Sequence, residues 1–120
     1  MNFVNGTVKG GKLMFGNIEL DLSHKLGAKT AEWEGKKIVF GFRPESIVLG
    51  EQENAYQVTA LVELTEMLGD NANVYIDVEN EKAILKVDPH DTPEVDSTIR
   101  FSIPYENMYL FDGETELVIK

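Results

Sequence analysis

The sequence predicts an all-β protein built from about ten short strands. Apolar and polar residues alternate with a period of two over much of the 120 residues, and glycine, proline, asparagine and aspartate interrupt the alternation at short intervals. A period of two places every second side chain on the same face of a strand, whereas a helix repeats about every 3.6 residues. The pattern is typical of a β-barrel or a β-sandwich and does not choose between them.

The first half of the chain contains short strands separated by turns. Strands are expected at residues 3–8, 12–15, 18–22 and 36–42. Gly16-Asn17 is a two-residue hairpin signal between the second and third of these strands. Residues 23–34 lack alternation and are expected to form a loop with a helical turn at residues 30–33. Pro44 ends the strand at residues 36–42 because proline has no backbone N–H. Residues 45–49 are expected to form a turn and a short strand.

The longest alternating run lies in the second half, at residues 56–67, with Leu61 as the exception to the pattern. Further strands are expected at residues 73–78, 83–87, 98–103, 108–111 and 117–119. Aromatic side chains within strands are expected in the core, and these are Phe40, Phe42, Tyr75, Phe101 and Phe111. Trp33 lies between two glutamates in the expected loop, so it is either part of the core or an anchor at an interface.

Composition and charge limit the possible partners. The formal net charge of −10 repels the phosphate backbone, and the chain lacks the basic groove with interleaved aromatic residues that binds nucleic acid. Anionic lipid surfaces are disfavoured for the same reason. No apolar run approaches the ~20 residues that span a bilayer, and the absence of cysteine excludes disulfides and thiol catalysis. We therefore expect one cytoplasmic domain without direct membrane insertion.

The sequence contains no convincing catalytic or metal-binding group. Gly10-Gly11-Lys12 lacks the upstream glycine and the following hydroxyl of a phosphate-binding loop, so it is expected to be a turn. His24 and His90 have no second histidine at ligand spacing and are expected to be exposed in loops. Ser46, His90 and Asp88 could be drawn as a Ser/His/Asp triad, but no nucleophile-elbow context supports a hydrolase. The acidic loop of Asp88, Asp91, Glu94 and Asp96 lacks the regular spacing and the turn glycine of a calcium site.

Gly41-Phe42-Arg43-Pro44-Glu45 is the most informative run of the sequence. It ends an apolar stretch at a proline, and the residue before a proline is pushed toward an extended backbone. The backbone therefore directs the Arg43 side chain, whose planar fork of donors suits carboxylates and carbonyls. One interpretation is an ion pair between Arg43 and Glu45 that fixes the corner. The other is a contact surface for a neighbouring subunit or a regulator.

This run resembles the Gly-Ile-Arg-Pro-Glu signature in the C-terminal domain of carbohydrate-importing ABC transporter ATPases, the maltose and multiple-sugar group. Three further segments resemble the same family, in the same order and at similar spacing. They are Met1-Asn2-Phe3 with Gly6-Thr7-Val8, Val62-Glu63-Leu64-Thr65-Glu66-Met67-Leu68-Gly69, and Tyr109-Leu110-Phe111-Asp112. The sequence departs from the family pattern at Phe42, and also after Asp112, where Gly113-Glu114-Thr115-Glu116 replaces Pro-x-Thr-Gly.

The resemblance implies an OB-type β-barrel, either single or as two linked sub-barrels. It implies a non-catalytic regulatory and dimerisation domain over residues 1–120, excised from a longer ATPase subunit whose absent part binds ATP and magnesium. The implied partners are its own ATPase domain, a second copy, the transporter membrane subunits and a regulatory protein, at the cytoplasmic face of the cell membrane. The positions that the resemblance assigns to this role are Gly41, Arg43, Pro44, Glu45, Glu66 and Gly69.

Two questions stay open at this level. Met67 and Leu68 are expected to be exposed at a hairpin tip, where they suit either a structural turn or a partner surface. A small-ligand-binding barrel is the alternative function, because related barrels bind oxyanions such as molybdate. The negative charge and the lack of clustered donors count against an oxyanion here, whereas a sugar or metal site on the barrel face stays open.

Overall fold

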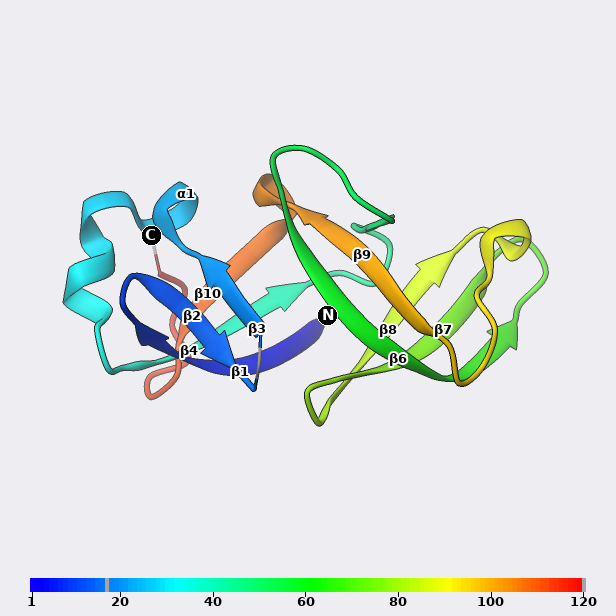
Figure 1. Cartoon of the computed structure of the whole chain (residues 1–120), viewed down its shortest axis with the longest axis horizontal. Coiled ribbons are helices and arrows are strands. Elements are labelled where there is room, and N and C mark those ends of the chain that lie inside the picture. The colour runs from blue at the N-terminus through cyan, green and yellow to red at the C-terminus, as the bar shows by residue number, and fades with distance from the viewer. Residues whose placement is uncertain (17, 120) are drawn as a thin grey trace.

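The chain folds into two antiparallel sheets that lie one after the other along the long axis of the molecule (Figure 1). The structure is a computed structural model that describes residues 1–16 and 18–119, with the side chains of all of these except His24, Lys25 and Ala28. The molecule measures 44 × 24 × 24 Å. The all-β prediction is confirmed, and the expectations for Asn17 and for the His24 side chain fall outside the described part.

The first sheet has the strand order β10-β4-β1-β2-β3. Its strands are β1 (Asn2–Lys9), β2 (Lys12–Phe15), β3 (Ile18–Asp21), β4 (Lys37–Phe42) and β10 (Met108–Asp112). Each lies within one residue of its expected bounds. The expected strand at residues 117–119 is reduced to a single bridge between Phe111 and Val118.

The second sheet has the order β5-β9-β6-β7-β8. Its strands are β5 (Val48–Leu49), β6 (Ala55–Met67), β7 (Ala72–Val78), β8 (Glu81–Val87) and β9 (Thr98–Pro104). The pairing of β6 with β7 shifts between Val62 and Leu64, as at a β-bulge. The whole second sheet lies in sequence between β4 and β10, which pair with each other from Met108↔Phe42 onward.

The connection between the two N-terminal hairpin strands and β4 is more helical than expected. Helix α1 (Ser23–Leu26) leads into the 3-10 helix η1 (Gly27–Trp33), where the sequence predicts a loop with one helical turn. Leu22 and Leu26, four residues apart, are both buried, and the Leu26 N–H donates to the Leu22 carbonyl at 2.8 Å. Trp33 packs against the core, which favours the first of its two interpretations. Two other 3-10 turns are η2 (Pro89–Asp91) and η3 (Tyr105–Asn107).

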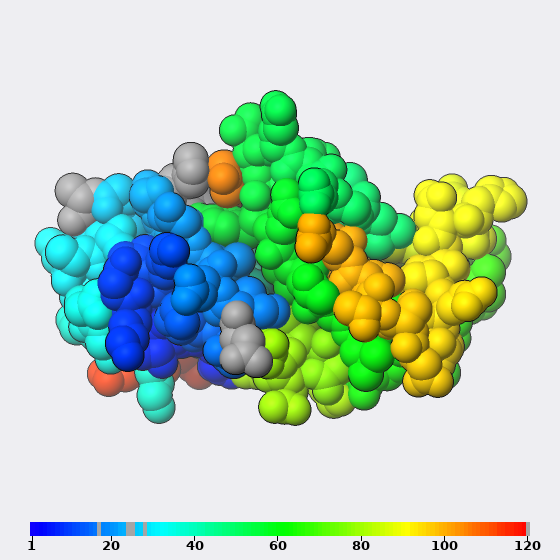
Figure 2. All heavy atoms as spheres, in the orientation of Figure 1, coloured from blue at the N-terminus to red at the C-terminus, as the bar shows by residue number. Residues whose placement is uncertain are grey.

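One hydrophobic core continues through both sheets. Aromatic rings connect the two halves, because Phe40 stacks near Phe42 with 6.2 Å between centroids and Phe42 lies 5.9 Å from Phe101 of β9. Figure 2 shows the N-terminal third of the chain and the residues of β6 to β9 filling opposite halves of one continuous body. Three of the expected core aromatics, Phe40, Phe42 and Phe101, are almost fully buried.

The edge strand β8 of the second sheet is hydrogen-bonded to the start of β1 and to the corner after β4. Asn2 Nδ2 donates to the Ile84 carbonyl at 2.7 Å, and the Ile84 N–H donates to Asn2 Oδ1 at 2.9 Å. The Lys86 N–H donates to the Pro44 carbonyl at 2.8 Å. Strand ladders within the described ranges form two sheets and close no barrel. Pro44 has no backbone N–H, so it cannot donate a hydrogen bond back to β8, and a regular strand ladder between β8 and this corner cannot form.

Candidate functional site

The corner after β4 is fixed by its backbone and by an aromatic contact. The Ser46 N–H donates to the Arg43 carbonyl at 3.0 Å, which closes the turn around Pro44. The Arg43 guanidinium lies 5.8 Å from the centroid of the Tyr109 ring, a cation–π distance. Within residues 1–16 and 18–119 no ion pair joins Arg43 to Glu45, so the ion-pair interpretation is wrong. Arg43 follows the outward-facing positions of β4 and contacts Tyr109 of β10, whereas Glu45 lies within the turn.

Gly41 lies beneath side chains of two other strands. Gly41 is buried and its φ is not positive, so glycine is required here because a side chain would not fit and not because of the backbone conformation. A Cβ at this position would lie 3.0 Å from Met1 Sδ and 3.1 Å from Phe111 Cε2. The glycine therefore lets the N-terminus and Phe111 approach the outward face of β4.

An exposed aromatic surface covers this outward side of the first sheet, and we call it the aromatic face. It consists of Phe3 of β1, Val39 of β4, and Tyr109 and Phe111 of β10, and Gly41 lies buried among them. The Phe3 and Phe111 rings meet edge to face with 5.8 Å between centroids. Phe3 is 52% exposed. The core prediction for Phe111 is wrong, because Met108 and Leu110 take the inward positions of β10.

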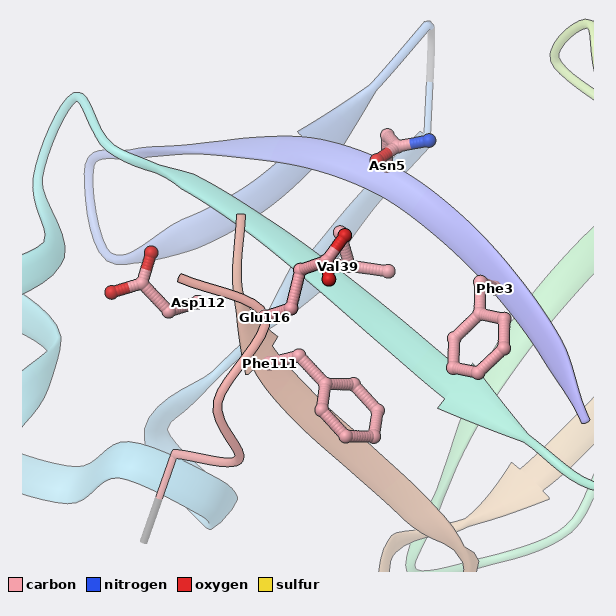
Figure 3. Close-up of a pocket in the computed structure, with 6 residues that line it drawn as sticks. All are labelled: Phe3, Asn5, Val39, Phe111, Asp112 and Glu116. Carbon is pink, nitrogen blue, oxygen red and sulfur yellow. The ribbon is translucent and has the colours of Figure 1, made fainter. Parts of the chain in front are cut away.

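A hollow of about 510 Å³ opens on the aromatic face (Figure 3). Its lining combines apolar and polar side chains from β1, β4, β10 and the C-terminal segment, namely Phe3, Asn5, Val39, Phe111, Asp112 and Glu116. In Figure 3 the rings of Phe3 and Phe111 lie near each other, the Glu116 side chain lies beside Val39, and the Asp112 carboxylate points away from the two rings. The hollow thus combines an aromatic side with the Glu116 carboxylate and the Asn5 amide.

The Asp112 carboxylate is kept ionised. The Glu114 N–H donates to Asp112 Oδ1 at 2.8 Å and the Thr115 N–H at 3.3 Å, and these backbone donors lower the pKa of Asp112. Asn5 Nδ2 donates to Glu81 Oε1 at 3.0 Å, so one of the two N–H donors of this amide is already engaged. The polar atoms left for a bound molecule are mainly acceptors.

Glu66 and Gly69 lie elsewhere, at the β6–β7 hairpin tip at the far end of the second sheet (Figure 1). Glu66 Oε1 accepts from Asn73 Nδ2 at 3.3 Å and from the Tyr75 hydroxyl at 3.4 Å. Tyr75 therefore faces outward, and its predicted place in the core is wrong. Gly69 has φ +92°, a conformation that favours glycine.

The hairpin tip also exposes apolar side chains. Met67 is 61% exposed and Leu68 is 48% exposed, which confirms the expectation for these two residues. The structure thus separates the six candidate positions into the corner group, Gly41, Arg43, Pro44 and Glu45, and the hairpin-tip pair. Sequence reasoning missed Phe3, Tyr109 and Phe111 as a joint surface, because only the structure shows that β1 and β10 pair with the two sides of β4.

The remaining candidate groups do not assemble. Asp88 Oδ1 accepts from the backbone N–H of His90 at 2.9 Å and caps η2. Across the described part of the chain, no cluster of three His, Cys, Asp or Glu side chains has the geometry to hold a metal ion. None of the described helices is both long enough and apolar enough to cross a membrane.

Family comparisons match both halves of this arrangement. A model of the MalK OB fold domain matches residues 1–47, and a model of the TOBE domain matches residues 40–111. The chain belongs to the TOBE domain family. The two matches overlap at residues 40–47, so they meet at the corner that links the two sheets of this TOBE domain.

Similar longer proteins are ATP-binding proteins of ABC transporters or of import systems. The TOBE domain is 29% identical over 122 residues to the ABC transporter ATP-binding protein YcjV of Escherichia coli K12, covering 100% of this chain and 34% of the relative. It is 25% identical over 126 residues to the oligosaccharides import ATP-binding protein MsmX of Bacillus subtilis, with the same coverage. It is 28% identical over 117 residues to the sn-glycerol-3-phosphate import ATP-binding protein UgpC of Escherichia coli O157:H7, covering 96% and 32%. The chain spans about a third of the length of these relatives.

A solved structure has the same fold. The cytoplasmic molybdate-binding protein ModG superposes with a TM-score of 0.66 at 18% identity, covering 91% of this TOBE domain and 94% of the ModG chain. At this identity the likeness concerns the fold.

Proposed function

We propose that residues 1–120 are a single non-catalytic accessory domain of a carbohydrate-importer ATP-binding subunit, which pairs with a second copy and regulates the ATPase. One observation carries the proposal. Three segments that resemble the importer family, around Phe3, Gly41 and Phe111, come together on the aromatic face although they are far apart in sequence.

The exposed rings suit a protein contact. Phe3 is 52% exposed and Tyr109 is 36% exposed, and large exposed apolar side chains gathered on one surface mark interaction sites. Arg43 lies at the edge of the same surface through its contact with Tyr109, and aromatic and arginine side chains are enriched among the residues that dominate binding energy. The hairpin tip with Glu66, Met67 and Gly69 is a second, smaller contact region in this proposal.

The proposed partners are those that the family resemblance implies. They are the ATPase part of the same subunit, a second copy, the membrane subunits through the full-length protein, and a regulatory protein. ATP and Mg²⁺ would be bound by the ATPase part, and the location would be cytoplasmic, against the inner face of the cell membrane. Nucleic acid is not a proposed partner, because a net charge of −10 repels it.

Sedimentation of the 120-residue chain over a range of concentrations tests the pairing role. We expect weak, concentration-dependent self-association, because contacts of this kind are modest in area. The Phe3→Ser variant should sediment as a monomer, whereas Met67→Ser at the hairpin tip should weaken association less. A strictly monomeric wild-type chain, or two variants with equal behaviour, would contradict the proposal. Hydrolysis of ATP by the chain alone would contradict its non-catalytic role.

A small-ligand module is the second candidate function. ModG, which has the same fold, is a molybdate-binding protein. An oxyanion does not suit the hollow of the aromatic face, because Asp112 and Glu116 would repel it. A neutral ligand is compatible with the same lining.

A further inference from the structure

We propose that the hollow of the aromatic face binds a neutral carbohydrate. The inference goes beyond the pairing role and does not depend on it, and because Phe3 and Phe111 belong to both surfaces, sugar binding should compete with pairing. The hollow measures about 510 Å³, within the range of about 300–1,000 Å³ that is typical of small-molecule sites. This volume has room for a small saccharide.

The aromatic side of the hollow provides a surface for the apolar face of a sugar ring. Phe3 and Phe111 meet edge to face at 67° between their planes, so their faces point in different directions. The faces of aromatic rings are electron-rich and attract weakly polarised C–H groups. Phe3 is the more accessible of the two rings, because it is 52% exposed whereas Phe111 is half-buried.

The polar lining of the hollow offers hydrogen-bond acceptors. The Glu116 carboxylate and the Asn5 side-chain oxygen accept, and one of the two N–H donors of the Asn5 amide is already bonded to Glu81. No lysine or arginine is among the six lining residues. A bound molecule must therefore bring donors and must not bring negative charge.

A carbohydrate meets these requirements better than a peptide. Each sugar hydroxyl donates one hydrogen bond and leaves its oxygen free for solvent, which the open hollow admits. A peptide segment carries as many carbonyl acceptors as N–H donors, and these acceptors would find few donors in the lining. A sugar phosphate or a sulfate would face the carboxylates of Asp112 and Glu116 and should be rejected.

Isothermal titration and NMR titration of the 120-residue chain with maltotriose, trehalose and lactose test the proposal. At least one sugar should bind in the micromolar to millimolar range. Phe3→Ala and Glu116→Gln should each weaken its binding by about tenfold, a loss that corresponds to one good contact. Met67→Ala at the hairpin tip is the matched control and should leave binding unchanged. Both Phe3 and Glu116 are exposed, so their variants should keep the wild-type circular dichroism spectrum.

Three results would overturn the inference. The first is the absence of binding by every sugar tested. The second is sugar binding that neither Phe3→Ala nor Glu116→Gln changes, which would place it elsewhere. The third is tighter binding of molybdate or sn-glycerol 3-phosphate than of the sugars. Self-association that Phe3→Ala abolishes, in a chain that binds no sugar, would assign the hollow to a second copy and leave the pairing role intact.

Discussion

Removal of the Asn2 side chain should destabilise the joint between the two sheets. Asn2 is 9% exposed, and its amide makes both hydrogen bonds to the backbone of Ile84, at 2.7 and 2.9 Å. In Asn2→Ala the Ile84 N–H and carbonyl both lose their partner. An unsatisfied buried group costs ~1–3 kcal/mol, and Ile84 is only half-buried, so the lower end of this range applies to each group.

The expected loss is about 2–3 kcal/mol of the free energy of unfolding, or a fall in Tm of roughly 10 °C for a domain of this size. Urea denaturation with a two-state fit measures it. Asn2→Asp retains the acceptor but places a carboxylate oxygen against the Ile84 carbonyl, so it should lose nearly as much at neutral pH. The control is Asn5→Ala, whose exposed bond to Glu81 should change stability by less than about 0.5 kcal/mol. An Asn2→Ala variant as stable as the control variant would refute the reasoning.

Three other substitutions and conditions give sharp expectations. The Tyr56 hydroxyl is buried without a hydrogen-bond partner in the described structure, and burial raises its pKa; Tyr56→Phe should therefore be neutral or stabilising by up to about 1 kcal/mol in thermal unfolding. Gly69→Ala, at φ +92°, should cost roughly 1 kcal/mol in the same assay because an L side chain strains this conformation. Hydrogen bonds from the Lys82 ammonium and the Asn80 N–H lower the pKa of Asp77. The Asp77–Lys82 pair therefore stabilises the folded state at pH values above the unfolded-state pKa of Asp77, and this contribution is lost as pH falls below about 4. The Lys82→Gln variant should then lose less stability than wild type between neutral and acidic pH, and equal acid profiles would argue against the pair.

The strands were predictable because their alternation is local. The bounds of β2 are those expected, and β4 and β6 differ from expectation by one residue at their first position. Alternation fails at residues 23–33, where Leu22 and Leu26 are buried by a short helical path that no period-two pattern describes. Hydrogen bonds between distant backbones, such as Pro44 with Lys86, depend on the bend of whole sheets and leave no signal in the local sequence.

The site was predictable in part. The motif around Arg43 identified the corner, but its assumed partner was a sequence neighbour, whereas the structure offers Tyr109 from the other end of the chain. A strand pattern reveals two faces without saying which is buried, so the sequence alone places Phe111 in the core. Only the neighbouring positions of β1, β4 and β10 place Phe111 beside Phe3 on the outside.

The position of the second sheet between β4 and β10 has a consequence for how the molecule forms. Phe42 and Met108 are paired neighbours, so the chain leaves the first sheet and returns to it at almost the same place. All five strands of the second sheet are contiguous in sequence, and they can pair before β10 has been synthesised. The first sheet must wait for β10, and contacts between such distant segments form slowly. During synthesis the N-terminal strands therefore remain incomplete longest, and an exposed edge of β4 is the point at which aggregation would begin.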